Sequence, residues 1–150
     1  METIRVFSRQ DAERFEPKTT HAWISITTPG DDIASIPYRK TYSSGILRSQ
    51  FHDIDDGERS SGTDSKGNYY IIPDELHARE IYHFVNMCYK SIRDLFIHCD
   101  AGISRSAGVA AALAKIYFDN NDKFFEAPYY PNRRIYRLIM ELHNRISTKV

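Results

Sequence analysis

The sequence predicts a single α/β domain in which a mostly parallel sheet carries helices on both faces. Three observations lead to this prediction. Short apolar segments with the pattern of strands alternate along the chain with segments whose apolar residues recur at helical spacing. The 150 residues fit one domain, 1–150, and neither a repeat nor a long linker divides them. In the second half, an apolar strand leads through a tight glycine-containing loop into a run of helix formers.

The N-terminal segment is expected to form two strands around a short helix. Residues 4–7 predict the first strand, and Ser8 can cap a helix that ends near Pro17. Residues 22–26 predict the second strand. This strand ends at a turn signal, the dipeptide at 29–30.

The middle of the chain is expected to hold more loop than regular structure. Residues 30–46 predict a loop with at most one helical turn, and residues 46–54 alternate as a third strand does. Residues 57–67 are rich in serine and glycine, which predicts a solvated surface loop. A short extended piece is expected at 69–72.

The second half predicts three helices and one further strand. Asp74 can cap a helix whose apolar face contains Leu76 and reaches Ile92, and residues 95–97 form a short buried strand. The next helix follows the glycine-containing loop and ends near residue 120. After a loop at 122–131, the last helix spans 132–147 with these apolar residues inward: Ile135, Leu138, Ile139, Leu142 and Ile146.

Composition narrows the class of protein. The net charge is zero, with 20 basic and 20 acidic residues, which argues against a nucleic-acid or membrane-surface partner. The N-terminus lacks the apolar core of a signal peptide, and no apolar run approaches membrane-spanning length. Two cysteines do not make a disulfide framework. We therefore expect a soluble cytoplasmic protein, of an oligomeric state that the sequence leaves open.

The most informative stretch is residues 97–108, where the buried strand passes into a helix. The N–H groups of such a loop can point inward, and the helix dipole adds positive potential, so the loop is a cradle for an anion. Cys99 stands at the mouth of this cradle and is expected to be held there as a thiolate. Six positions later, Arg105 can grip two phosphate oxygens at once. Thiolate, cradle and guanidinium together point to nucleophilic attack on a phosphate ester.

The loop resembles the signature of a known enzyme family. His98-Cys99-x-x-Gly102-x-x-Arg105-Ser106 is similar to the signature loop of the cysteine-dependent protein tyrosine phosphatases, and the fuller His-Cys-x-Ala-Gly-x-Ser-Arg-Ser form is closest to the dual-specificity branch. The resemblance implies a sheet of four or five strands flanked by helices. It also implies hydrolysis of phosphotyrosine, and in dual-specificity members of phosphoserine and phosphothreonine, in a phosphorylated protein or peptide. No cofactor or metal is implied.

The resemblance also implies a role for each residue of the loop. Cys99 would form a phosphocysteine intermediate, and Arg105 would bind the phosphoryl oxygens. Ser106 would hydrogen-bond the sulfur and help it leave, although a helix cap is the alternative. His98 would be a buried structural residue. The phosphate-binding amides would be those of Asp100, Ala101, Gly102, Ile103, Ser104 and Arg105.

The general acid is harder to assign. Members of the family use an aspartate on a loop after an upstream strand, and Asp53, Asp55 and Asp56 all follow the third predicted strand. Asp53 fits best because it comes directly after the apolar strand. It precedes Cys99 by 46 positions, whereas the family spacing is roughly 30. Residues 57–67 would be the insertion that accounts for this difference.

Three further features have two interpretations each. Asn132 lies in a segment that resembles one bracing the loop in dual-specificity phosphatases, and it is equally a helix N-cap. The pair Arg133 and Arg134 can attract a phosphopeptide or simply form a solvated helix face. Cys88 lies on a buried helix face, so it is a core residue or, alternatively, a redox partner of Cys99.

Two other functions compete with a protein phosphatase. Phosphoinositide and RNA 5′-phosphate phosphatases of this kind place lysines inside the loop, where this chain has Asp100, Ile103 and Ser104. A catalytically weak phosphopeptide-binding module is the alternative from another class. Such a module usually lacks the cysteine or the arginine, and this chain has both.

Overall fold

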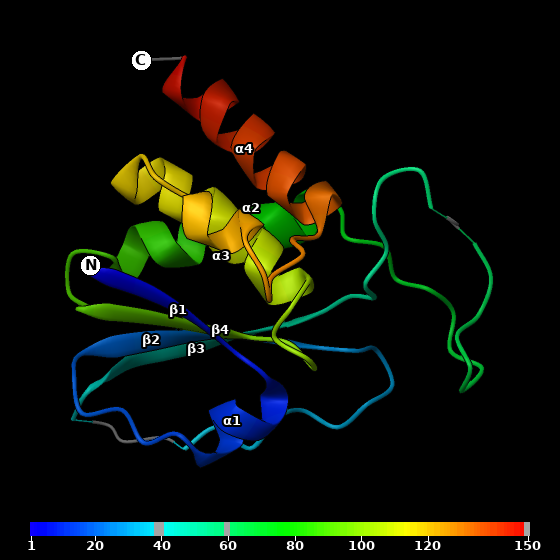
Figure 1. Cartoon of the computed structure of the whole chain (residues 1–150), viewed down its shortest axis with the longest axis horizontal. Coiled ribbons are helices and arrows are strands. Elements are labelled where there is room, and N and C mark those ends of the chain that lie inside the picture. Colours follow the sequence, from blue (N-terminus) through cyan, green and yellow to red (C-terminus); the bar gives the residue numbers. More distant parts are fainter. Residues whose placement is uncertain (38–40, 59–60, 149–150) are drawn as a thin grey trace.

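A parallel sheet forms the centre of the molecule. The computed structural model describes residues 1–37, 41–58 and 61–148, and within these residues four strands form one sheet in the order β1-β4-β2-β3. All three strand pairings are parallel, as the sequence predicts. The central strand β4 lies between β1 and β2 (Figure 1). The strands are β1 Thr3–Phe7, β2 His21–Thr27, β3 Ser43–Gln50 and β4 Asp94–His98.

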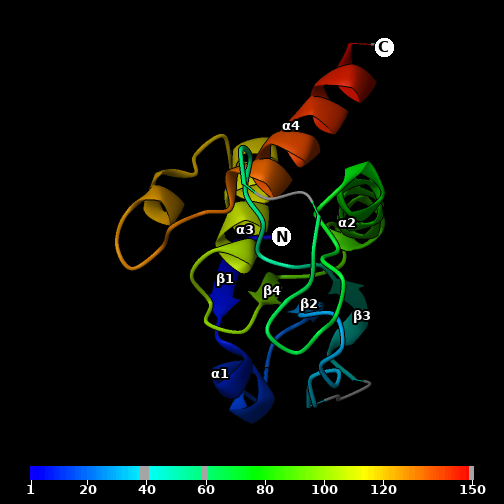
Figure 2. The same ribbon diagram turned by 90° about the vertical axis from the view of Figure 1, so that its right-hand side faces the viewer.

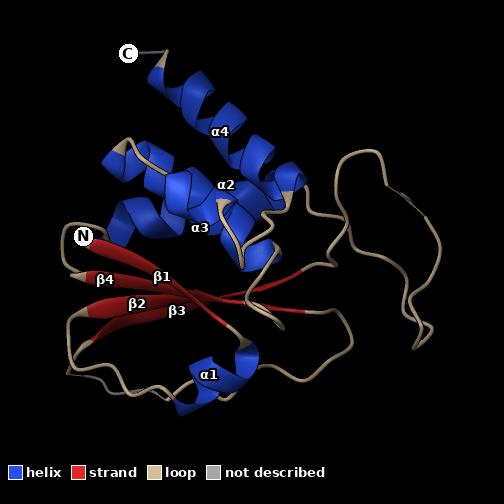
Figure 3. Cartoon of the chain, in the orientation of Figure 1, coloured by secondary structure: helices blue, strands red, loops and turns tan. Residues whose placement is uncertain are grey.

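Helices cover both faces of this sheet unequally. Three long helices lie on one side, the last of them packed against the other two, and the short α1 lies on the other side (Figures 1 and 3). Ser8 caps α1 by accepting from the Asp11 N–H at 3.1 Å, and Asp74 caps α2, so both predicted caps are confirmed. The helices are α1 Arg9–Arg14, α2 Glu75–Cys88, α3 Arg105–Phe118 and α4 Arg133–Ser147, with a 3₁₀ turn η1 at Asp122–Phe125.

The core has one part on each face of the sheet. Between the sheet and the three long helices lie aliphatic side chains such as Ile24, Ile97 and Leu113, all fully buried. On the α1 side, Trp23 and Phe96 form an aromatic cluster with their ring centroids 5.1 Å apart. Successive residues of β2 therefore enter opposite cores, which explains why every residue of that strand is buried.

Several predicted boundaries and burial assignments need correction. The third strand spans Ser43–Gln50 and not 46–54, because its pairing with β2 ends at Thr27 opposite Gln50. Leu76 and Ile146 were expected inside but are 60% and 37% exposed. Helix α2 ends at Cys88, so Ile92 is buried beyond it.

The loop expected at 30–46 is shorter than predicted, because β3 begins at Ser43. Residues 31–37 form no helix, and residues 38–40 of that prediction lie outside the described residues. The extended piece expected at 69–72 is reduced to one antiparallel bridge, between Thr63 and Tyr69. None of the helices in the described part of the chain is both long and apolar enough to cross a membrane.

The parallel arrangement gathers four loops at one edge of the sheet. The carboxyl ends of β1, β2, β3 and β4 lead directly into Ser8, Thr28, Phe51 and Cys99. Because parallel strands end on the same side, these four positions lie at one edge, on the right in Figure 3. Ligands bind at this edge in open α/β sheets, so we expect the functional site at this edge.

Candidate active site

The cysteine-containing loop connects the central strand to a helix. Strand β4 ends at His98 and α3 begins at Arg105, so the loop faces the positive end of the α3 dipole. Gly102 has φ +72°, and a Cβ at this position would lie 2.7 Å from the backbone of Phe7 and Ser8. Only glycine fits here, because the loop passes tightly over the end of β1.

Cys99 and Ser106 lie side by side in the loop. The sulfur of Cys99 is 3.0 Å from Oγ of Ser106, and both residues are buried. Ser104, and not Ser106, holds the N-cap position of α3. The Ser106 hydroxyl is therefore directed at the sulfur, where it can stabilise negative charge.

His98 connects the loop to strand β2 through the two nitrogens of its ring. Its side chain is fully buried, with Nε2 2.6 Å from Oγ of Ser25, the residue opposite it in β2. Its Nδ1 lies 3.2 Å from the carbonyl oxygen of Cys99. Burial lowers the pKa of His98, which favours the neutral ring. In that form Nδ1–H donates to Cys99 and Nε2 accepts from Ser25.

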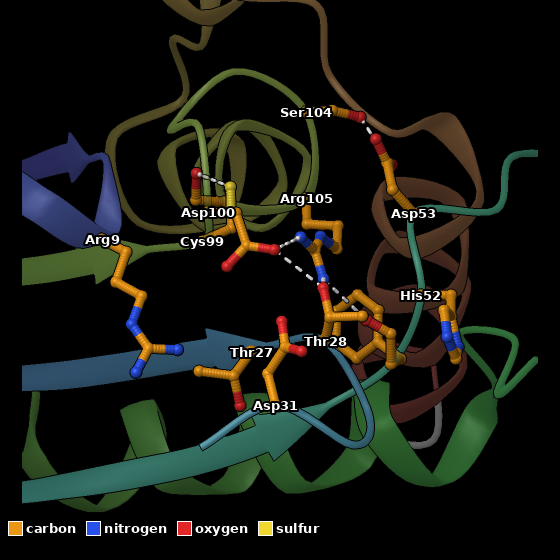
Figure 4. Close-up of polar contacts among 12 residues, drawn as sticks. Arg9, Thr27, Thr28, Asp31, His52, Asp53, Cys99, Asp100, Ser104 and Arg105 are labelled. Atoms are coloured by element: carbon orange, nitrogen blue, oxygen red, sulfur yellow. Dashed lines mark hydrogen bonds and ion pairs between the residues drawn. The ribbon is translucent and has the colours of Figure 1, made fainter. Parts of the chain in front are cut away.

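Arg105 is held by three acceptors from three segments. Its guanidinium is buried, and Nη1 donates to the Phe51 carbonyl oxygen at 2.9 Å and to Oγ1 of Thr28 at 3.0 Å. Its Nη2 donates to Oδ2 of Asp100 at 2.9 Å (Figure 4). Sequence reasoning missed Thr28, although its position directly after the buried β2 was a signal that would have found it.

Asp100 is a charged member of the loop. Burial by itself raises the pKa of this carboxyl, but hydrogen bonds from Thr28 and Arg105 and the charge of Arg105 outweigh burial. The net result is a pKa below the ordinary value of an aspartate. Asp100 is therefore a carboxylate at neutral pH, in contact with the arginine of the loop.

Asp53 is the predicted acid that lies at the loop. Its Oδ1 accepts from Oγ of Ser104 at 2.8 Å and from Nδ2 of Asn132 at 2.9 Å. Figure 4 shows its side chain directed at Ser104, on the opposite side of Arg105 from Asp31. Both hydrogen bonds orient the same carboxylate oxygen, and within the described part of the chain the other oxygen, Oδ2, has no hydrogen-bond partner.

The two other candidate acids bind α4 instead of the loop. Oδ1 of Asp55 accepts from the Arg134 N–H at 3.0 Å, in the first turn of that helix. Asp56 forms two hydrogen bonds with Arg137, of 2.8 and 2.9 Å, and the bond to Arg137 lowers the pKa of Asp56. Both carboxylates are therefore engaged in holding α4.

Asn132 has both of its predicted roles. Its Oδ1 accepts from the Ile135 N–H at 3.0 Å, which caps α4. Its N–H donates to the carbonyl oxygen of Ser104 at 2.9 Å, and the Tyr130 N–H donates to that of Ile103 at 2.9 Å. The segment before α4 thus braces the loop and connects it to Asp53.

Residues 57–67 are mostly exposed, but they are tied to the edge of the site. Asp64 accepts from Nε2 of His52 at 2.9 Å, and Lys66 pairs with Asp31 at 2.9 Å. A Cβ on Gly30 would overlap the side chain of Asn68, which packs on the turn after β2. The expectation of a solvated loop holds for most of these residues, but Asp64 and Asn68 are partly buried, and this part of the loop lies beside the turn after β2 (Figure 2). Residues 59–60 lie outside the described residues.

Cys88, Arg133 and Arg134 lie in helices outside the loop that contains Cys99. Cys88 and Cys99 are both free, and burial raises the pKa of the Cys88 thiol. Arg134 donates to the Pro73 carbonyl oxygen at 2.9 Å, whereas Arg133 is exposed. Within residues 1–37, 41–58 and 61–148, no group of three or more His, Cys, Asp or Glu side chains is arranged to hold a metal ion.

Comparison with known proteins finds similarity of structure. No protein-family model matches the chain, and no curated protein matches its sequence. The human tyrosine phosphatase-like serine/threonine/tyrosine-interacting protein has a TM-score of 0.54 at 15% identity, over 85% of this chain and 78% of that one. PTPMT1 in complex with PI(5)P gives 0.52 at 15%, over 87% and 80%. Tk-PTP in the active form gives 0.53 at 13%, over 97% and 93%.

Proposed function

Because the chain has the fold of the tyrosine phosphatase-like proteins, we propose that it hydrolyses phosphate monoesters through a phosphocysteine intermediate on Cys99. One observation carries the proposal. Cys99 and Arg105 lie six positions apart in one loop, and an aspartate from the segment after β3 joins them there, with Ser104 of the loop donating to Asp53 at 2.8 Å. This is the set of groups that such a reaction requires.

In the first step, the Cys99 thiolate attacks phosphorus and the ester P–O bond breaks. Asp53 gives its proton to the departing oxygen, which leaves as an alcohol or phenol. The charge of the transition state spreads over three equatorial oxygens of the phosphoryl group. Donors arranged beforehand stabilise this charge best, and here they are Arg105 and the N–H groups of residues 100–105.

In the second step, water attacks phosphorus and the P–S bond breaks. Asp53, now a carboxylate, takes a proton from that water, and inorganic phosphate is released. Ser106 donates to the departing sulfur from 3.0 Å, which stabilises the thiolate. Every step uses groups of the chain itself, so we propose a reaction without metal or cofactor.

A phosphotyrosine in a protein or peptide is the substrate that the site supports best. A phenolate with a pKa of about 10 needs a proton on leaving, and Asp53, oriented by its two hydrogen bonds, would supply one. Phosphoserine and phosphothreonine, with still more basic leaving groups, stay within the proposal. The reducing cytoplasm is the compartment that suits a working thiolate.

A phosphoinositide or RNA 5′-phosphate is the second candidate, since PTPMT1 has been crystallised with PI(5)P. The charges around the loop favour such a substrate less than they favour a phosphotyrosine. Asp100 adds a negative charge beside Arg105, and Lys66, a cation of the insertion, is paired with Asp31. A substrate with several phosphates would meet repulsion here.

A phosphopeptide-binding module without turnover is the alternative outside enzymes. It would bind through the same cradle and would not need a general acid. Asp53 is nevertheless oriented by two hydrogen bonds at the loop, an arrangement that binding alone does not require. This favours an enzyme.

Turnover of an aryl phosphate tests the proposal. Wild type should release phosphate from p-nitrophenyl phosphate with EDTA present, and Cys99→Ser should abolish release while retaining phosphopeptide binding. Cys88→Ser is the matched control, because Cys88 is buried in α2 and should be dispensable for turnover. Full activity in Cys99→Ser, or activity that EDTA removes and a divalent ion restores, would contradict the mechanism.

A further inference from the structure

We propose that Thr28 and Asp100 are positioning residues that keep one edge of the Arg105 guanidinium turned toward the phosphoryl group. The proposal rests on the function proposed above and names two residues that determine how well the arginine acts. Neither residue touches the reacting atoms through its side chain in the mechanism above. Both would act through Arg105.

The three side chains form a closed ring of hydrogen bonds (Figure 4). Oγ1 of Thr28 donates to Oδ2 of Asp100 at 2.8 Å. The same Oγ1 accepts from Nη1 of Arg105 at 3.0 Å, and the same Oδ2 accepts from Nη2 at 2.9 Å. The ring joins the ends of β2 and β4 to the start of α3, so it fixes the arginine relative to the sheet.

The Arg105 guanidinium has more N–H groups than its three hydrogen bonds use. A guanidinium has five N–H groups: one at Nε and two at each terminal nitrogen. The two at Nη1 go to Thr28 and to the carbonyl oxygen of Phe51, and one at Nη2 goes to Asp100. Among the described residues, Nε–H and the second Nη2–H have no hydrogen-bond partner. Two such donors can bind two oxygens of one phosphoryl group.

Burial of Arg105 and the turn after β2 fix this orientation of the guanidinium. Arg105 is only 6% exposed, so a wrongly turned guanidinium would bury donors without partners. Thr28 is itself placed by the turn that follows β2, in which the Asp31 N–H donates to the Thr28 carbonyl oxygen at 3.0 Å. Gly30, with φ +90°, allows that turn. The position of the hydroxyl therefore comes from the fold.

A series of variants tests the ring through kcat on p-nitrophenyl phosphate. Thr28→Val removes the hydroxyl at nearly constant shape, and we expect kcat to fall on the order of tenfold or more because the arginine is misplaced in the transition state. Thr28→Ser should restore most of the rate. Asp100→Ala should lower kcat as Thr28→Val does, whereas Asp100→Asn keeps an oxygen acceptor and should lower it less.

The Arg105→Lys background separates positioning from a general structural effect. Lysine cannot form the fork, so Arg105→Lys should lower kcat on the order of 10². If Thr28 acts only through the arginine, Thr28→Val should cost little more in that background. Thr20→Val is the control, because that hydroxyl accepts from the Arg93 N–H at the opposite end of β2 and should leave kcat unchanged.

The outcomes distinguish this inference from the proposed function. An inactive wild type overturns both. An active wild type with an unchanged Thr28→Val, or with equal losses from Thr28→Val in the wild-type and Arg105→Lys backgrounds, overturns the positioning role alone. A rise in kcat/KM for Asp100→Ala would likewise overturn it, because Asp100 would then block the arginine. Urea midpoints matching wild type establish that the variants compared are folded.

Discussion

Three carboxylates that stand close together in the sequence have three different surroundings. Asp53 accepts from Ser104 of the loop, Asp55 accepts from the backbone of α4, and Asp56 pairs with Arg137. The chemistry of an aspartate is the same in each case, so position alone separates them. Asp53 is the one whose carboxylate contacts the loop that contains Cys99, and we therefore expect it to be the general acid of the proposed reaction.

Asp53→Asn should show a defect that depends on the leaving group. Tyrosine, with a pKa of about 10, needs protonation on leaving, whereas a strongly acidic phenol leaves almost unaided. We expect phosphotyrosine turnover to fall on the order of 10² or more, within the range of general acid catalysis, and turnover of an activated aryl phosphate to fall far less. Steady-state kinetics with a series of aryl phosphates measures this.

The matched controls are Asp55→Asn and Asp56→Asn. Both should retain the wild-type dependence on leaving-group pKa, and Asp56→Asn should lower stability only slightly, because Arg137 loses one charged partner and keeps Glu141. If either control shows the selective defect and Asp53→Asn does not, the acid is that residue. If none of the three shows it, the proton comes from another group.

At the scale of elements, His52 connects the insertion to the site. Its Nδ1 accepts from the Ile71 N–H at 2.9 Å and its Nε2 donates to Asp64 at 2.9 Å, so one side chain holds both the insertion and the segment that follows it. Asp64 also accepts from the N–H groups of Lys66 and Asn68, both at 2.9 Å. The insertion is therefore organised around one carboxylate.

Asp64→Ala should loosen the attachment of the insertion to His52 and the segment after β3. The change removes the bond to His52 and the acceptor of two backbone N–H groups. We expect faster hydrogen–deuterium exchange of residues 61–71, measured by mass spectrometry, with kcat on a small aryl phosphate within a few-fold of wild type. Asp64→Asn keeps an oxygen acceptor and should change the exchange less. Unchanged exchange in Asp64→Ala would show that other contacts hold the insertion.

At the scale of the whole molecule, a buried histidine couples stability to pH. His98 joins β4 to β2 through Ser25, and burial lowers its pKa in the folded protein. Between its unfolded pKa, about 6.5, and its lower folded pKa, the unfolded chain binds a proton that the folded chain does not. The contribution of His98 is therefore complete above about pH 6.5 and is lost as the pH falls below that value.

Urea unfolding at pH 7.5 and at pH 5.5 measures this contribution. The free energy of unfolding of wild type should be lower at pH 5.5, and His98→Asn should reduce the difference between the two pH values whatever its absolute stability. Asp100 and Asp56, whose pKa values lie below the ordinary value, lose their contributions only at lower pH. Equal pH dependence in wild type and His98→Asn would contradict this account.

The sequence by itself determined the features that depend on neighbouring residues. The caps at Ser8 and Asp74 and the strand–loop–helix around Cys99 and Arg105 are local, so spacing and residue type were enough to predict them. The parallel pairing was predictable in part, because helices separate β1 from β2 and β3 from β4, whereas β2 and β3 are parallel without a helix between them. In each of these cases the partners lie within a few residues or follow a general rule of connection.

Only the tertiary structure decided the features that depend on distant partners. Helical spacing identifies one face of a helix but not how far its neighbour extends, which is why Leu76 and Ile146 are exposed. The contact of Asp53 with Ser104, the contact of Thr28 with Arg105 and the contact of His52 with Asp64 likewise join positions 12 to 77 residues apart. Such contacts form where parallel strands end together, and the sequence does not record which side chains meet there, because their distances depend on the register of the whole sheet.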